Sequence, residues 1–165
     1  MGRNVNLEIE LYEPMRVWLK KYLEDNYRGA EIITIDSHAR TLDSFLEEIG
    51  IINQYPQTVG LDIQIDVLGL IRRKANTDIV FIEAKKTKLN LHDLGQLWAY
   101  SKLCNPLEAF LLSSAGTGSL DKILNNLRRT DILDFGDGKI IRKMQVGKWD
   151  IFKNAIDYRT LIPKI

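Results

Sequence analysis

Two carboxylates stand inside apolar, β-branched segments of this 165-residue chain. Asp66 lies within the sequence IQIDVLG, and Glu83 lies within the sequence VFIEAK. Segments of this composition are typical of buried strands, where an unpaired charge costs several kcal/mol. We therefore expect each carboxylate to have a partner or a ligand that offsets this cost.

Residues 61–71 and 78–85 predict two strands, and the polar residues between them predict the turn of a β-hairpin. Side chains alternate along a strand, so Glu83 and Lys85 share one face. Pairing of the two strands would bring Asp66 beside Glu83. Paired carboxylates suit Mg²⁺, which proteins commonly hold with one or two of them. A structural cluster of ion pairs is the alternative, although apolar residues often replace such a cluster without loss of stability.

The order of these residues resembles the PD-(D/E)XK nuclease superfamily, which includes restriction endonucleases, Holliday junction resolvases and repair nucleases. Asp66 lies in the first strand, Glu83 and Lys85 end the next strand, and a helix with Gln96 and Tyr100 follows. The resemblance covers residues 61–114, with a weaker extension to the amphipathic helix after Glu13. Ile65 stands where the family usually has a proline before the aspartate.

The resemblance implies an α/β fold with a restriction-endonuclease-like core, in which helices flank a central mixed β-sheet. It implies a metal-dependent endonuclease that hydrolyses phosphodiester bonds in DNA, with Mg²⁺ as the cofactor and Mn²⁺ as the alternative ion. The implied metal ligands are Asp66, Glu83 and the backbone carbonyl of Ala84, with Glu13 as an additional acidic contact. Lys85 is implied to orient the attacking water, and Gln96 to position water or a phosphate.

Hydrophobic periodicity and turn residues predict the remaining elements of one domain over residues 1–165, with four or five strands in its sheet. The predicted helices cover 14–25, 41–49, 91–103, 120–129 and 149–158, the further strands cover 31–35 and 107–112, and a hairpin joins 131–135 to 139–146.

Basic residues concentrate in the second part of the chain. Residues 1–62 carry 6 basic and 11 acidic side chains, whereas residues 63–165 carry 17 basic and 11 acidic ones. Clusters of this kind favour contact with a phosphate backbone, although solvated loop charges are the alternative. The predicted nucleic-acid contacts are Arg72, Arg73, Lys86 and Lys88.

The composition is that of a soluble globular protein, with 45% apolar and 27% charged residues. No membrane-spanning run or signal-peptide core is visible, so we expect a cytoplasmic protein. A single nuclease site cuts one strand, so the hypothesis includes a homodimer that binds DNA. Its expected contact is the hairpin of residues 131–146, with the side chains of Phe135, Ile140, Ile141 and Met144. The alternative function is a catalytically inactive nuclease-fold module that binds nucleic acid or protein.

Overall fold

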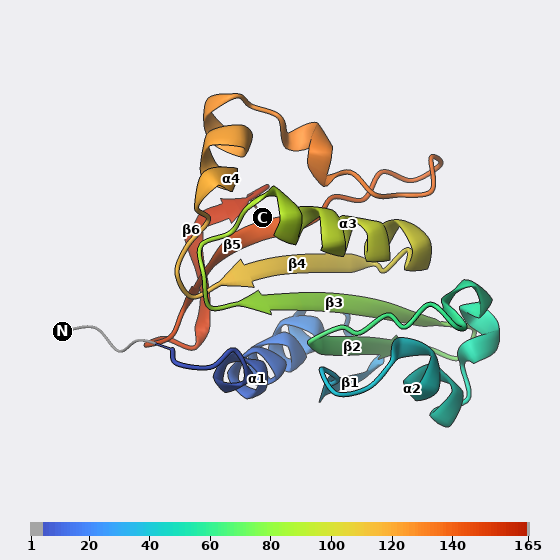
Figure 1. Ribbon diagram of the computed structural model, residues 1–165. Coiled ribbons are helices and arrows are strands. Elements are labelled where there is room, and N and C mark those ends of the chain that lie inside the picture. The colour runs from blue at the N-terminus through green and yellow to red at the C-terminus, as the bar shows by residue number, and fades with distance from the viewer. Residues whose placement is uncertain (1–4, 165) are drawn as a thin grey trace.

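A single mixed β-sheet organises the protein (Figure 1). The computed structural model describes residues 5–164, and within them six strands pair in the order β1 to β6. The strands are β1 (Glu31–Asp36), β2 (Val67–Arg72), β3 (Thr77–Lys85), β4 (Glu108–Ser113), β5 (Gln145–Asp150) and β6 (Ala155–Ile162). The helices are α1 (Ile9–Asn26), α2 (Leu42–Glu48), α3 (Leu91–Cys104) and α4 (Ser119–Asp121), and short turns cover Ile52–Gln54, Pro56–Thr58, Lys122–Asn126 and Thr130–Leu133.

Strand directions divide the sheet into two antiparallel parts around a parallel centre. Strands β1, β2 and β3 are mutually antiparallel, β3, β4 and β5 are parallel, and β6 returns antiparallel to β5. Helix α3 makes the crossover from β3 to β4, as parallel neighbours require. The expected α/β class and the mixed sheet flanked by helices are confirmed, and the sheet has six strands where four or five were predicted.

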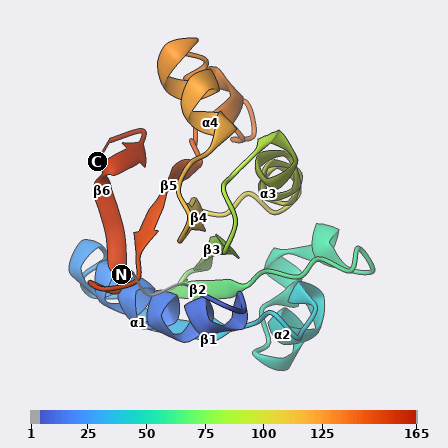
Figure 2. The ribbon, with the colours of Figure 1, turned by 60° about the vertical axis from the view of Figure 1, so that its left-hand side comes forward.

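The helices form layers on both faces of the sheet (Figure 2). Helix α1 covers one face, where Met15, Leu19 and Leu23 are fully buried in a cluster with Val67 and Val80. Helices α2, α3 and α4 contribute to the cluster on the other face, together with the alternate residues of β2 and β3. Both faces of β3 are therefore covered, which explains its continuous apolar sequence.

Gly69 permits a close approach between α1 and the sheet. A Cβ atom at this position would lie 2.8 Å from Cδ1 of Leu23 and 3.1 Å from Cδ2 of Leu19. A larger residue at position 69 would therefore require the Leu23 and Leu19 side chains of α1 to move. The N-terminal turns of the same helix approach the end of β3 (Figure 1).

The predicted helix over residues 149–158 is wrong, because this segment contains the turn of the β5–β6 hairpin. Trp149 and Ile156 are paired in register and are both buried in the cluster beneath α1. Asn154 has a positive φ of 49°, a conformation that asparagine tolerates in tight turns. The cross-strand pairing outweighs the helical spacing of the apolar residues.

The segment over residues 131–146 only partly matches the predicted hairpin. One isolated bridge joins Asp134 and Lys143, and the preceding residues form a 3₁₀ turn. Phe135 and Met144 are buried in the core, so of the side chains expected at a dimer surface only Ile140 and Ile141 are exposed. The predicted helix over 120–129 is reduced to α4 and a π-helical turn.

Helix α1 begins at Ile9, five residues before the predicted start, so Pro14 lies inside the helix. Among the described residues, no helix combines the length and the apolar character needed to cross a membrane.

The N-terminus of α3 provides a direct test of local stability. The Asn90 side chain accepts a hydrogen bond from the Asp93 N–H at 3.0 Å, and the Asp93 carboxylate accepts one from the Asn90 N–H at 3.1 Å. Asn90→Ala should lower the free energy of unfolding by about 1 kcal/mol, because it leaves the Asp93 N–H without its cap. Urea titration of this variant beside His92→Ala, an exposed position in the same turn, would measure the effect. Equal stabilities of the two variants would contradict the capping assignment.

Candidate metal centre

Asp66 continues the sheet by means of its side chain. The residue immediately precedes β2, and its Oδ2 accepts a hydrogen bond from the Ala84 N–H of β3 at 2.8 Å. The backbone carbonyl of Asp66 accepts a hydrogen bond from the Ser37 N–H at 3.0 Å. The predicted strand over 61–71 is too long at its start, because β2 begins at Val67, but the hairpin still holds the Asp66 carboxylate at the carboxyl end of β3.

Glu83 is a buried carboxyl with one unsatisfied oxygen. The residue is 6% exposed, and its Oε2 is buried without a hydrogen-bond partner among the described residues. Burial and the charge of Asp66 raise the pKa of Glu83 to about 9, and a hydrogen bond with Asp66 adds to this rise. The Lys85 ammonium lies 3.9 Å from Oε1 and acts in the opposite direction. The lysine is therefore too distant to satisfy the glutamate by a hydrogen bond.

The backbone carbonyl of Ala84 is on the β2 side of β3, the side on which Asp66 lies. The neighbouring carbonyl of Lys85 accepts a hydrogen bond from the Ser114 N–H, on the β4 side of β3. Successive carbonyls of a strand point to opposite edges, so the Ala84 carbonyl points to the β2 side. Three oxygen groups, two from side chains and one from the backbone, therefore converge where β2 begins and β3 ends.

Helix α1 contributes two side chains that the sequence did not single out. Asp66 interacts with Tyr12, whose pKa is raised by burial and by the charges of Asp66 and Glu8. The charge of Glu8 also raises the pKa of Glu83. The spacing of four residues between Glu8 and Tyr12, which places both on one helix face, is the signal that could have found them.

Two predicted site residues lie outside this cluster. Glu13 forms an ion pair with Arg16 at 2.6 Å and is largely exposed, because it lies on a different face of α1 from Glu8 and Tyr12. Gln96 is exposed on α3, and its amide lies 3.5 Å from the Tyr100 hydroxyl. Gln96 forms no hydrogen bond with the carboxylates of the cluster in the described part of the chain.

The basic residues that were predicted to contact nucleic acid lie at opposite ends of the sheet. Arg72 and Arg73 lie at the β2–β3 turn, which is about 26 Å from Lys85 along the nine residues of β3. Lys86 and Lys88 follow the carboxyl end of β3, where the Lys86 ammonium donates a hydrogen bond to the Asn6 carbonyl at 2.8 Å. Only the second pair is near the carboxylates.

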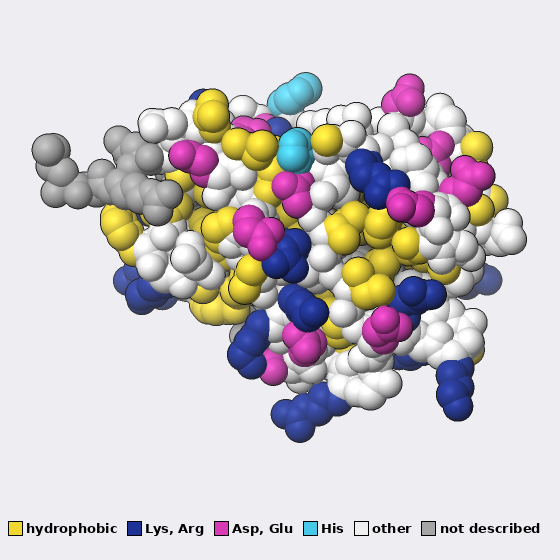
Figure 3. All heavy atoms as spheres, turned by 90° about the horizontal axis from the view of Figure 1, so that it is seen from below, with side chains coloured by type: hydrophobic (Ala, Val, Ile, Leu, Met, Phe, Trp, Pro, Cys, Tyr) yellow, Lys and Arg dark blue, Asp and Glu magenta, His cyan; other side chains and the backbone are white. Residues whose placement is uncertain are grey.

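Charges of both signs are mixed on the face that Figure 3 shows from below, on the side of β1 and α2. Lys and Arg side chains alternate there with Asp and Glu side chains, and apolar patches lie between them. The acidic excess of residues 1–62 therefore does not produce a uniformly acidic surface on this face.

The cluster fits Mg²⁺ by its donor chemistry. Within residues 5–164, no group of three or more His, Cys, Asp or Glu side chains converges as a metal site. Mg²⁺ is commonly held by one or two carboxylates and completes its octahedron with water and substrate phosphate. Asp66, Glu83 and the Ala84 carbonyl match that requirement, and the unsatisfied Oε2 of Glu83 is an oxygen that a cation would satisfy.

Comparisons of the chain with protein-family models, with curated proteins and with solved structures find no match. The arrangement of Asp66, Glu83 and Lys85 in the fold therefore carries the functional argument.

The raised pKa of Glu83 predicts how stability depends on pH. The folded protein retains a proton on Glu83 that the unfolded chain loses near pH 4.5. The contribution of Glu83 to stability is therefore greatest below that pH and falls toward about pH 9, by at most about 1.4 kcal/mol per pH unit. Chemical denaturation of the metal-free protein from pH 5 to pH 8 should show a decline that Glu83→Gln reduces.

Glu13→Gln is the matched control, because the ion pair with Arg16 holds the pKa of Glu13 below its usual range. If wild type and Glu83→Gln lost stability equally over this range, the buried proton on Glu83 would be excluded.

Proposed function

We propose that this protein is a metal-dependent endonuclease with a restriction-endonuclease-like core, which hydrolyses phosphodiester bonds in DNA. The observation that carries the proposal is the buried Glu83 carboxyl, one of whose oxygens is unsatisfied, beside Asp66 and Lys85 at the end of β3. An acid pair in this position destabilises the metal-free fold, which is expected when the pair serves a cation and its substrate. The resemblance to PD-(D/E)XK nucleases supports the same reaction.

The chain's own residues have distinct roles in this proposal. Asp66, Glu83 and the Ala84 carbonyl would hold Mg²⁺, or Mn²⁺ in its place. The bound ion lowers the pKa of water and stabilises negative charge that develops on a phosphate. Lys85 is 19% exposed at its side chain, so its ammonium can reach solvent and orient a water molecule or contact a phosphate oxygen. Gln96 would contact substrate only from the exposed side of α3.

A catalytically inactive nuclease-fold module that binds nucleic acid or protein is the alternative. Such a module would not need the unsatisfied Glu83 oxygen, since apolar residues at buried ionic positions are often neutral or stabilising. A homodimer belongs to the main proposal, because a double-strand break requires two sites of this kind. The exposed Ile140 and Ile141 are candidates for the contact between its two copies.

The proposal predicts cleavage of DNA that depends on Mg²⁺ and on three side chains. Asp66→Asn, Glu83→Gln and Lys85→Ala should each reduce cleavage roughly 100-fold or more, because each removes a charge from the reacting phosphate's surroundings. Gel assays on linear, circular, branched and single-stranded DNA, with Mg²⁺, Mn²⁺ or EDTA, would measure this.

Glu13→Gln should cleave as the wild type does, since Glu13 is paired with Arg16 outside the cluster. Thermal unfolding should show that all the variants remain folded. Undiminished cleavage in EDTA, or in any of the three site variants, would refute the proposed centre. Binding of DNA without cleavage under all conditions would favour the inactive module.

The separation of the basic clusters predicts where DNA binds. Lys88→Ala should reduce the salt dependence of duplex binding by roughly 0.9 in the slope of log K against log salt, the value for one lost phosphate contact. Arg73→Ala should leave the slope unchanged, because Arg73 pairs with Asp78 at the far end of β3. Fluorescence anisotropy in Ca²⁺, over a range of salt, measures both. A larger effect at Arg73 would place the DNA at the wrong end of the sheet for this proposal.

A further inference from the structure

A pocket lies beside the β5–β6 hairpin, outside the carboxylate cluster. Its volume is about 290 Å³, and it is lined by Ser114 from the end of β4 and by Lys148, Asp150, Phe152, Asp157 and Arg159 from the hairpin. We call it the hairpin pocket. Its volume is close to the lower end of the range for small-ligand sites and suits a single nucleotide rather than a larger group.

An irregularity in β6 shapes the pocket. Lys148 pairs with Asp157 while Val146 pairs with Ile162, so additional residues of β6 bulge out between these pairs. Where the backbone pairing of β5 and β6 is interrupted, the Thr160 hydroxyl accepts a hydrogen bond from the Lys148 N–H at 2.8 Å. Bulges turn side chains away from the regular ladder, and this one presents Arg159 with its side chain 88% exposed.

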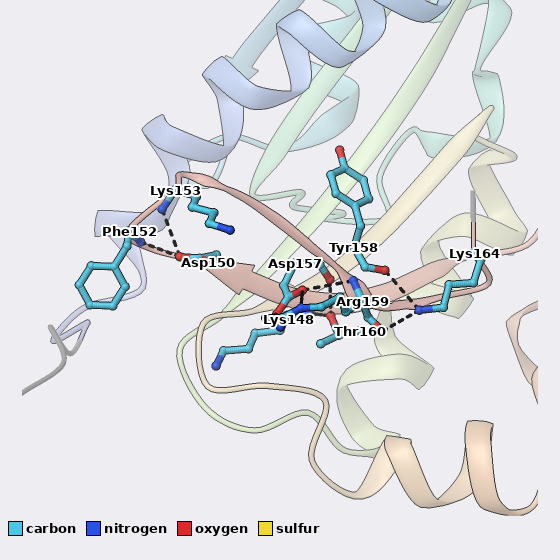
Figure 4. Close-up of polar contacts among 9 residues, drawn as sticks. All are labelled: Lys148, Asp150, Phe152, Lys153, Asp157, Tyr158, Arg159, Thr160 and Lys164. Atoms are coloured by element: carbon cyan, nitrogen blue, oxygen red, sulfur yellow. Dashed lines mark hydrogen bonds and ion pairs between the residues drawn. The ribbon is translucent and has the colours of Figure 1, made fainter.

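The acidic residues of the pocket are satisfied within the hairpin (Figure 4). Asp150 accepts hydrogen bonds from the N–H groups of Phe152 and Lys153, and Asp157 forms a two-point ion pair with Arg159 at 2.9 Å. The exposed Lys148 ammonium forms no hydrogen bond or ion pair with any residue in the range 5–164. Its charge helps to hold the pKa of the cross-strand Asp157 below its usual range, but its N–H donors remain open to a phosphate at the pocket.

The register of the sheet places this charge on the same face as Lys85. Lys85 pairs with Ser113 of β4, and Ser113 pairs with Lys148 of β5. Paired residues point to the same face, and two strand spacings separate Lys85 from Lys148 by roughly 10 Å between Cα atoms. The buried Ser113 between them is covered by the segment at Thr87, so a strand of nucleic acid that contacts both lysines would pass over this segment.

Phe152 adds an aromatic surface to the pocket. Its side chain is 71% exposed at the tip of the hairpin, and the two hydrogen bonds to Asp150 order the turn that carries it. Figure 4 shows Phe152 and Lys148 extending to the same side of the hairpin, whereas Tyr158 points to the other side. An exposed aromatic ring beside cationic groups is the combination that binds single-stranded nucleic acid, because every base can stack on the ring.

We propose that the hairpin pocket binds one unpaired nucleotide of the substrate, with the phosphate at Lys148 and Arg159 and the base on Phe152. This inference rests on the proposed nuclease function and deepens it. It assigns to the enzyme a substrate with a single-stranded segment next to the bond that is cut. A base within a duplex is already stacked on its neighbours and is not free to stack on Phe152.

The first experiment measures binding alone, in EDTA, with a fluorescent single-stranded oligonucleotide and with a blunt duplex. Phe152→Ala should weaken single-strand binding about tenfold or more and leave duplex binding unchanged, because stacking is lost only with an unpaired base. Lys148→Ala should lower the salt slope of single-strand binding by roughly 0.7. Tyr158→Ala and Lys74→Ala are the matched controls, since Tyr158 points away and Lys74 is exposed in the turn at the far end of the sheet.

The second experiment measures cleavage of two duplexes, one blunt and one with a single-stranded tail. The wild type should cut the tailed duplex faster, and Phe152→Ala should remove that preference while retaining the rate on the blunt one. If Phe152→Ala lost binding of the single-stranded tail and the wild type cut neither duplex, the result would support the hairpin pocket and refute the nuclease function. Cleavage with no preference for a tail, together with unchanged binding by Phe152→Ala and Lys148→Ala, would overturn the pocket and leave the nuclease in place.

Discussion

The hydrogen bond from the Ala84 N–H to the Asp66 carboxylate is the contact on which the candidate site depends. Backbone pairing between β2 and β3 ends at Val67 and Ile82, so β2 has no residue opposite Ala84. The Asp66 side chain takes the place of a backbone acceptor there and becomes part of the sheet. Its carboxylate is consequently fixed in direction and lies beside Glu83, whose backbone belongs to the same well-packed strand.

The two neighbouring carboxyl groups destabilise the fold electrostatically, because they lie in the sheet, the most buried layer of the protein. Two carboxyl groups at hydrogen-bond range cannot both ionise readily, so without a cation Glu83 tends to hold a proton. Apolar packing on the two faces of the sheet offsets the cost, because α1 covers one side of β3 and α3 covers the other. Such a pair of carboxylates requires a central strand. On an edge strand, water would screen the interaction between the two groups and the pKa of the glutamate would no longer be raised.

The sequence predicted the secondary structure correctly where the spacing of apolar residues and the packing of the folded chain favour the same element. The strand ending at Lys85 and the helix after Asn90 were predicted because a continuous apolar run and a capping asparagine are local signals. Residues 149–158 were misjudged because Trp149 and Ile156 also fit helical spacing, and only their pairing across a hairpin resolves the two possibilities. The early start of α1 had a similar effect on the site, because it makes Glu8 the N-cap residue of the helix, four residues before Tyr12, where its charge acts on Glu83.

The surface charges show why the remaining features could not be predicted from the chain alone. Arg73 and Lys88 are fifteen residues apart and were grouped together, yet a nine-residue strand places them at opposite ends of the sheet. Lys85 and Lys148 are distant in sequence, yet the ladder through Ser113 places them on one face. Register between strands is set by burial along their whole length, so no local pattern reveals it. The position of one basic residue relative to another is therefore a property of the sheet, and the irregular β5–β6 pairing, which accompanies the exposure of Arg159, is likewise visible only in the folded chain.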